Sequence, residues 1–256
     1  YDNPAVGKNL QEHVDVSIQC KNKMRDGLTL SPLGLIKLSV PFIQYILSSK
    51  GQLAHSLAEV GAFYRSSNEV KEPDIQAHLL PVMFNDSGYD WNPTLKHGFT
   101  CHVCLLRPES RGAVHLNPED PMAKPQITYG FLSEKSDQKA LLNGIRKALE
   151  ILKQPALAKH NGGIMFPNPC LSDAELLEQI KSKTGLIYHP AGTCKMGPKN
   201  DTGAVVDPEL KVIGVEKLRV IDASIMPTVI SGNTNAPTIA IAEKGADLIK
   251  ADALIH

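Results

Sequence analysis

The sequence predicts an α+β fold, in which an antiparallel sheet and several helices occupy different parts of the chain. Three strand-like segments, 99–106, 113–116 and 126–131, are separated by proline-containing turns, a pattern typical of antiparallel sheets. Two segments with helical signals follow, at 136–153 and 172–183. Because strands and helices are grouped rather than alternating, the order favours α+β over a parallel α/β sheet.

The first part of the chain contains one apolar stretch among less regular segments. Residues 1–30 are mixed and turn-rich, and residues 52–70 fit a packed loop or a strand. Residues 31–50 predict one or two helices, broken at Pro41 because proline lacks the helical N–H donor. Prolines and a lysine interrupt the apolar run from Leu30 to Leu47. We therefore expect buried helices there rather than a membrane span, which needs about 20 mostly apolar residues.

Two helices in the second half have clear local signals. Leucine and isoleucine recur at helical spacing through 136–153. A second helix should begin at Ser172, because Ser172 and Glu175 have the spacing of a capping box. It should run to about Lys183 and end at Gly185.

The C-terminal part predicts two short β-prone runs, 205–215 and 218–221, and one long helix. The helix is expected to begin near Pro237, a favoured first-turn residue, and to run to about Lys250. Its start is small and polar, so a ligand could approach the backbone closely there.

Composition argues against several classes of function. Lys plus Arg and Asp plus Glu both number 27, so no basic surface for nucleic acid is indicated. The five cysteines are odd in number and scattered, which does not describe a disulfide framework. Cys101 and Cys104 have the spacing of half a zinc site, but no second pair follows. A strand would also place them on opposite faces, so no metal is expected.

Two polar motifs contain residue types that suit alcohol chemistry. His189 lies between a helix and a glycine turn, and a neutral imidazole with a pKa of about 6.5 can accept a proton. Asn233 lies in the turn 231–235, and its carboxamide can donate to an alcohol or alkoxide oxygen. The following helix adds the positive end of its dipole. Two alternatives stay open, a structural histidine and an asparagine turn that only caps a helix.

Other kinds of chemistry have less support. No two glycines are separated by a single residue, so the G-x-G-x-x-G fingerprint is absent from this chain. Cys194 and His189 are a candidate nucleophile–base pair, but the residues around Cys194 match no hydrolase signature. Aromatic residues make up only 5%, which disfavours a lectin-like sugar-binding module.

These motifs resemble the C-terminal half of the glucose–methanol–choline (GMC) flavin oxidoreductases, in particular the insect glucose dehydrogenase-like branch. The resemblance is carried by five segments, namely 6–13, 107–112, 117–125, 189–197 and 218–249. The chain departs from the family at Glu12, where the family usually has Asp. The resemblance implies an antiparallel-sheet substrate domain with flanking helices, plus C-terminal pieces of a discontinuous Rossmann-like FAD domain whose N-terminal part is absent.

By this resemblance, residues 1–20 are the tail of an FAD-binding segment and residues 21–210 form the substrate-binding domain. Residues 211–256 return to the FAD-binding domain. We expect the chain to be a fragment that starts downstream of the ADP-binding unit. By itself it should be inactive and free of FAD.

The resemblance also implies a flavoprotein that oxidises the CH–OH group of an alcohol or a sugar. His189 corresponds to the base that takes the alcohol proton while a hydride passes to flavin N5. Asn233 corresponds to a residue that faces the substrate oxygen. The positions that would contact FAD are Asp222, Ala223, Asn235, Pro237 and Thr238.

The family resemblance further implies a quinone or oxygen as electron acceptor, and a secreted or extracellular location. The rival interpretation is a truncated, catalytically inactive GMC remnant that acts at most as a binding module. The substrate, and the choice between oxidase and dehydrogenase, stay open at this point.

Overall fold

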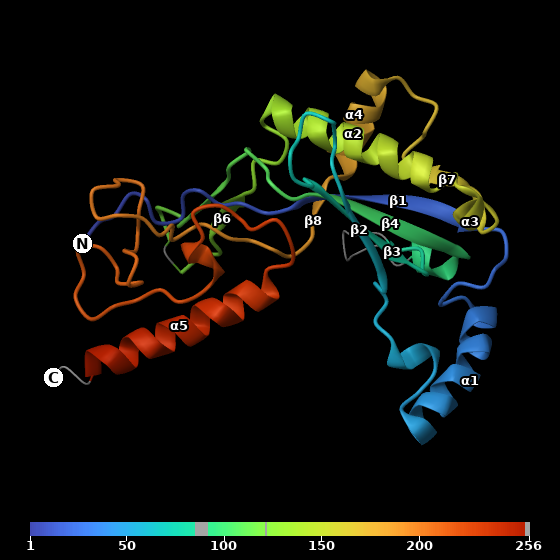
Figure 1. The fold of residues 1–256 in the computed structure, drawn as a ribbon, viewed down its shortest axis with the longest axis horizontal. Coiled ribbons are helices and arrows are strands. Elements are labelled where there is room, and N and C mark those ends of the chain that lie inside the picture. The colour runs from blue at the N-terminus through green and yellow to red at the C-terminus, as the bar shows by residue number, and fades with distance from the viewer. Residues whose placement is uncertain (85–91, 121, 254–256) are drawn as a thin grey trace. The chain divides into compact units, whose positions relative to one another are not determined.

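The computed structural model describes residues 1–84, 92–120 and 122–253 and divides the chain into two units (Figure 1). Unit 1 comprises Tyr1–Val14, Leu106–Asp137 and Leu186–His256, and unit 2 comprises Asp15–Leu105 and Gln138–Gly185. Each unit is therefore assembled from segments that are distant in sequence. The assignment of 1–20, 21–210 and 211–256 to FAD-binding and substrate-binding domains stays a prediction.

Unit 2 is built on a sheet in which the strand order is β2-β3-β4-β1-β7, with β8 paired to β1. The pairings of β1 with β7, β2 with β3 and β3 with β4 are antiparallel, as predicted. The strands are β1 (Val14–Asn22), β2 (Val60–Tyr64), β3 (Ile75–Leu80), β4 (Gly98–Leu105), β7 (Asn161–Phe166) and β8 (Gly185–Leu186).

Helix α2 (Lys135–Ile151) lies along this sheet, as Figure 1 shows. Leu141 and Ile145, from its predicted apolar stripe, are fully buried. Gly144 allows a close approach, since a Cβ at that position would lie 2.8 Å from Ile75 Cδ1. The prediction of a helix at 136–153 is thus confirmed, with small differences at the two ends.

Two shorter helices follow, α3 (Pro155–Ala158) and α4 (Asp173–Lys183). The predicted capping box of α4 is present. Ser172 Oγ accepts from the Glu175 backbone N at 3.4 Å, and Glu175 Oε2 accepts from the Ser172 backbone N at 3.0 Å. These reciprocal bonds satisfy N–H groups that the first helical turn leaves unpaired.

The central strands also carry a buried polar cluster. His102 Nδ1 lies 2.7 Å from Asp15 Oδ2 and 3.2 Å from Ser17 Oγ. His78 faces His102 across the β3–β4 pair, and burial lowers the pKa of His78. Within the described residues no group of His, Cys, Asp or Glu side chains is arranged to hold a metal ion.

Helix α1 (Pro32–Ser48) differs from the prediction in two respects. It continues through Pro41 as one helix, with Ser31 as N-cap and Pro32 at the first turn. Its large apolar side chains are exposed rather than buried, because within the described chain it packs on little more than the 3₁₀ turn η1 (Gln52–Ala54). Those side chains include Leu33, Leu35, Ile36, Val40, Phe42, Ile43, Ile46 and Leu47. None of the described helices, α1 included, is long and apolar enough for a membrane crossing.

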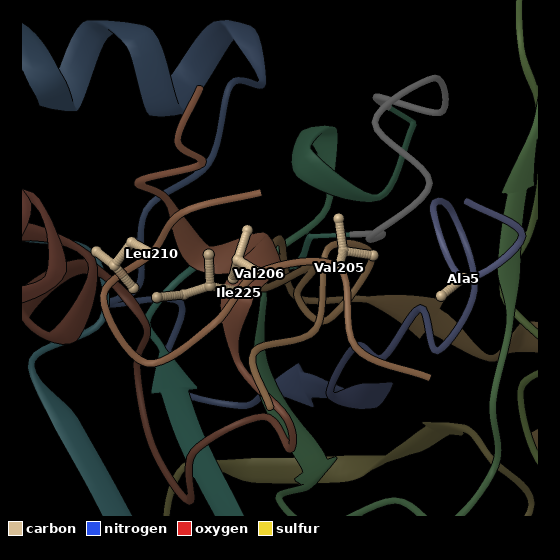
Figure 2. Packing of buried hydrophobic residues seen from close by; sticks show 5 residues of the cluster. All are labelled: Ala5, Val205, Val206, Leu210 and Ile225. Atoms are coloured by element: carbon tan, nitrogen blue, oxygen red, sulfur yellow. The ribbon is translucent and has the colours of Figure 1, made fainter. Parts of the chain in front are cut away.

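Unit 1 contains little regular structure around its core. Its elements are β5 (Ala113–His115), β6 (Gln126–Thr128), the 3₁₀ turn η3 (Ala223–Ile225) and α5 (Asn235–Ala253). The remaining 3₁₀ segment, η2 (Asn92–Leu95), belongs to unit 2. One apolar cluster joins its first and last segments, as Figure 2 shows. The members of that cluster are Ala5, Val205, Val206, Leu210 and Ile225.

Two predictions for this part of the chain need correction. Strands β5 and β6 form a separate two-stranded sheet and are not part of the sheet that contains β4. The β-prone runs 205–215 and 218–221 form isolated bridges instead of strands. The expected helix start near Pro237 is confirmed, since α5 begins at Asn235 and Pro237 lies in its first turn. The Thr238 N–H donates to the Thr234 carbonyl at 3.0 Å, a helical i to i+4 bond.

Candidate active site

His189 lies in unit 1 on a turn with unusual backbone angles. The residue before it, Tyr188, has φ of 65°, and Gly192 follows with φ of 92°. A positive φ is uncommon for a residue other than glycine and needs support from its surroundings. Glu12 supplies that support, since the His189 backbone N donates to both Glu12 carboxylate oxygens at 2.8 Å.

The segment from Gln11 to His13 connects two distant parts of unit 1. Gln11 and Ala191 exchange backbone hydrogen bonds at 2.9 Å in both directions, which fixes the His189 turn. The Gln11 side chain accepts from the Val229 backbone N at 3.2 Å and donates to the Pro227 carbonyl at 3.1 Å. The turn that leads into Asn233 is therefore held by the same short segment.

His13 is fully buried and contacts His189 directly. Their Nδ1 atoms are 3.0 Å apart, and the two rings meet edge to face at 86°. The other ring nitrogen of His13, Nε2, lies 2.8 Å from the Ile230 carbonyl oxygen. The pKa of His13 is lowered to about 4, mainly by burial and to a smaller extent by the nearby His189, while backbone contacts with Ile230 and Leu106 oppose the shift.

Asn233, in the turn just before α5, completes the arrangement. Its Nδ2 lies 3.5 Å from His189 Nε2, the ring nitrogen that points away from His13. His189 is half-buried and Asn233 is exposed, so both side chains reach the surface of unit 1. The structure thus brings together the two residues that the sequence singles out as catalytic candidates.

Glu12 places a buried carboxylate beside this pair, being only 2% exposed. Besides His189, it accepts from the His13 backbone N at 2.9 Å. Its charge also reaches Tyr129, where burial, and after it Glu12, raises the pKa of the phenol.

The predicted cofactor-binding residues lie on segments next to the His189 turn. The Gly192 and Cys194 backbone N atoms donate to the carbonyls of Ala223 and Ser224 at 3.4 and 2.9 Å. The exposed Asp222 uses its carboxylate to accept from the Ser224 backbone N at 2.8 Å. In this position Asp222 caps the η3 turn.

The other three candidates form the start of α5. Asn235 is exposed and Pro237 is half-buried. The Thr238 hydroxyl donates to the Thr234 carbonyl at 2.7 Å, so its proton is engaged within the helix. The first N–H groups of a helix have no intrahelical acceptor, and they give this end a partial positive charge.

The structure weakens the hydrolase alternative. Burial raises the pKa of the Cys194 thiol, which lowers the fraction of nucleophilic thiolate. The Cys194 backbone pairs with Ser224, and the His189 ring contacts His13 and Asn233.

Sequence reasoning missed Glu12 and His13 as site residues. They are 177 and 176 positions from His189, a separation that no local motif bridges. The available signal was that both residues end segment 6–13, one of the segments that carry the family resemblance, directly before an apolar strand pattern.

Comparison with known proteins identifies the family. The family model described as GMC oxidoreductase matches residues 108–242, more than half of the chain. The chain is 42% identical over 254 residues to alcohol dehydrogenase [acceptor] of Pseudomonas putida, covering 97% of this chain and 45% of that protein. It is 43% identical over 253 residues to oxygen-dependent choline dehydrogenase of Klebsiella pneumoniae subsp. pneumoniae, covering 98% and 44%.

Among solved structures, a variant of formate oxidase from Aspergillus oryzae RIB40, studied for FAD modification, superposes with a TM-score of 0.85. The identity is 28%, over 98% of this chain and 48% of that one. The chain therefore spans less than half the length of each of these relatives. The family match, the shared fold and the sequence identity lead to one conclusion: the chain belongs to the GMC oxidoreductase family.

Proposed function

We propose that this chain is the reacting part of an FAD-dependent enzyme that oxidises the CH–OH group of an alcohol or a sugar. The observation that carries the proposal is the approach of His189 Nε2 to Asn233 Nδ2, at 3.5 Å. Relatives named as alcohol and choline dehydrogenases support an alcohol substrate. Since the chain spans less than half of those relatives, the activity is proposed for the complete enzyme that contains it.

The C-terminal segments fit an FAD molecule in their chemistry. The positive end of α5 and the exposed Asn235 carboxamide suit the electron-rich pyrimidine edge of a flavin. The backbone at Asp222 and Ala223 runs beside the His189 turn, where it can line the cofactor. When bound, FAD supplies the acceptor for the hydride that leaves the alcohol carbon.

The side chains of this chain divide the remaining work. His189 takes the hydroxyl proton as general base, a role worth about 10²–10⁴-fold in rate. Asn233 donates a hydrogen bond to the same oxygen as negative charge develops on it. Glu12, with its buried carboxylate next to the turn, favours the imidazolium that results. The final electron acceptor is proposed to be a quinone or oxygen.

The complete enzyme, in which this chain is joined to its FAD-binding remainder, allows a direct test. A panel of alcohols and sugars is assayed with a dye acceptor and with oxygen, for the wild type, His189→Ala and His115→Ala. His115 is an exposed histidine of unit 1 and serves as the matched control. We expect His189→Ala to lower kcat by about 10²–10⁴-fold, with His115→Ala close to the wild type.

Flavin absorbance, recorded for each variant, separates loss of cofactor from loss of chemistry. Near-normal turnover in FAD-loaded His189→Ala would remove the base assignment. An FAD-loaded wild type that oxidises no alcohol or sugar would favour the inactive remnant instead.

A further inference from the structure

The contact between His13 and Ile230 has a defined direction. A carbonyl oxygen can only accept a hydrogen bond. At 2.8 Å from the Ile230 oxygen, Nε2 of His13 must therefore carry the proton. In histidine, the bond made by one ring nitrogen decides which state the other nitrogen adopts.

His13 has a single ring proton, because it is neutral. Its side chain is fully buried, and burial together with the neighbouring His189 keeps its pKa near 4, below the working range of most enzymes. With the proton on Nε2, Nδ1 of His13 holds a lone pair and acts as an acceptor.

The protonation state of His13 then determines which ring nitrogen of His189 carries its proton. The two Nδ1 atoms are 3.0 Å apart, and one of them has to donate. Since His13 Nδ1 is the acceptor, His189 Nδ1 carries the proton. In neutral His189 the lone pair is therefore on Nε2.

The contact at the other ring nitrogen of His189 is compatible with this state. His189 Nε2 lies 3.5 Å from Asn233 Nδ2, and an amide NH₂ group can only donate. A donating Asn233 amide pairs with an acceptor at His189 Nε2. The same protonation state of His189 follows from the Ile230 carbonyl, acting through His13.

From this geometry we infer that His13 is a positioning residue that fixes the tautomer of His189. It holds the proton of His189 on Nδ1 and so presents the basic Nε2 atom on the side of Asn233. The catalytic meaning of this rests on the proposed function, whereas the tautomer is a property of the chain itself and can be measured without turnover.

The arrangement has a consequence for proton transfer. When Nε2 takes the proton of an alcohol, Nδ1–H of His189 already donates to His13, so the new imidazolium needs no rearrangement. The proton stays on His189, because the burial of His13 makes a second charge there unfavourable. The opposite tautomer would place an N–H towards the substrate hydroxyl and could not accept its proton.

Long-range ¹H–¹⁵N correlation spectra of the ¹⁵N-histidine-labelled chain at neutral pH read the tautomers directly, because protonated and unprotonated ring nitrogens resonate in separate ranges. Loss of signals in His189→Asn and in His13→Phe assigns the two rings. We expect Nδ1–H for His189 and Nε2–H for His13. In His13→Phe, the Nε2–H form of His189 should become the major one.

Two further variants keep this test independent of folding. Phe and Asn both remove the imidazole of residue 13, but only Asn retains an acceptor oxygen close to the position of Nδ1. His13→Asn should therefore restore the Nδ1–H form of His189. Thermal unfolding of each variant shows whether the fold is kept. His115→Phe is the control and should leave the spectrum of His189 unchanged.

In the complete enzyme, His13→Phe should lower kcat at least about 10-fold with little change in KM, and His13→Asn should recover most of the loss. A wild-type chain with His189 protonated on Nε2 would overturn the inference. So would folded His13→Phe that keeps Nδ1–H on His189. The expected tautomers in an FAD-loaded enzyme that oxidises no alcohol would support the inference on His13 and contradict the proposed function.

Discussion

Glu12 holds the backbone N–H of His189 between its two carboxylate oxygens, each at 2.8 Å, across 177 positions of sequence. The same carboxylate accepts from the His13 backbone at 2.9 Å. One buried side chain therefore sets the position of both histidines. The geometry of the candidate site depends on the packing of unit 1 as much as on the local sequence around His189.

Replacing Glu12 with Gln should destabilise the protein, because the amide substitutes a donor for one acceptor that faces a backbone N–H. Buried hydrogen bonds to a charged group contribute about 1.5–3 kcal/mol each. We expect Glu12→Gln to lower the free energy of unfolding by about 2 kcal/mol, measured by denaturant titration. Glu119→Gln, at an exposed site of unit 1, is the control and should change the stability little. Equal stability of the two variants would contradict the role of Glu12 in holding the backbone of the two histidines.

Replacing Gly192 with Ala should disturb the His189 turn. Gly192 has φ of 92°, and a Cβ there would lie 2.5 Å from the Asn9 carbonyl oxygen. Strain of this kind costs about 1–3 kcal/mol. Gly232→Ala is the matched control, since an added Cβ at that position meets no atom within 4 Å. Thermal unfolding should show a clear loss for Gly192→Ala alone, and a similar change in both variants would refute the strain argument.

Stability should depend on pH through His13. Its pKa is about 4 in the folded chain, against 6.5 as the ordinary value, so between these values the unfolded state binds the additional proton. Stability is therefore fully present above pH of about 6.5 and falls as the pH decreases towards 4, by up to about 3 kcal/mol. The free energy of unfolding, measured by denaturant titration at several pH values in this range, should depend less on pH in His13→Phe than in the wild type. The same slope in wild type and variant would rule out this contribution.

The packing of α2 on its sheet predicts a contrast along one helix. Ile145 is fully buried, whereas Ile151 is 40% exposed. Ile145→Ala should cost about 2–5 kcal/mol of unfolding free energy, because it removes buried methyl groups and leaves a cavity. Ile151→Ala should cost clearly less. A comparable loss at both positions, measured by denaturant unfolding, would argue against α2 covering the sheet through this stripe.

The elements that the sequence predicts best are those with local signals. The apolar spacing of α2 and the Ser172–Glu175 capping box are complete within one segment, and both were located to within a few residues. Strands β1 and β7 pair although they are far apart in sequence, so no short sequence segment indicates that they are neighbours in the sheet. In β1, polar Asp15 and Ser17 are buried because His102 of another strand binds them, which hides the usual pattern of a strand.

The candidate site divides in the same way. The sequence could name His189 and Asn233, since the flanking turn and helix signals are local. It could not show that His13 and Glu12 join them, because those contacts form only when the first residues of the chain pack against its last third. The exposure of α1 was likewise not readable from its apolar composition, which fits a buried helix equally well.

The most direct test of the central claim is a double-mutant cycle on the rate of flavin reduction. The complete enzyme is mixed anaerobically with an alcohol substrate, for the wild type, His189→Ala, Asn233→Leu and the double variant. If both side chains act on one alcohol oxygen, the single losses are about 10²–10⁴-fold and 10²-fold. The double variant should then lose much less than their product. Losses that multiply as independent factors, or a single variant that reduces flavin at the wild-type rate, would contradict the account.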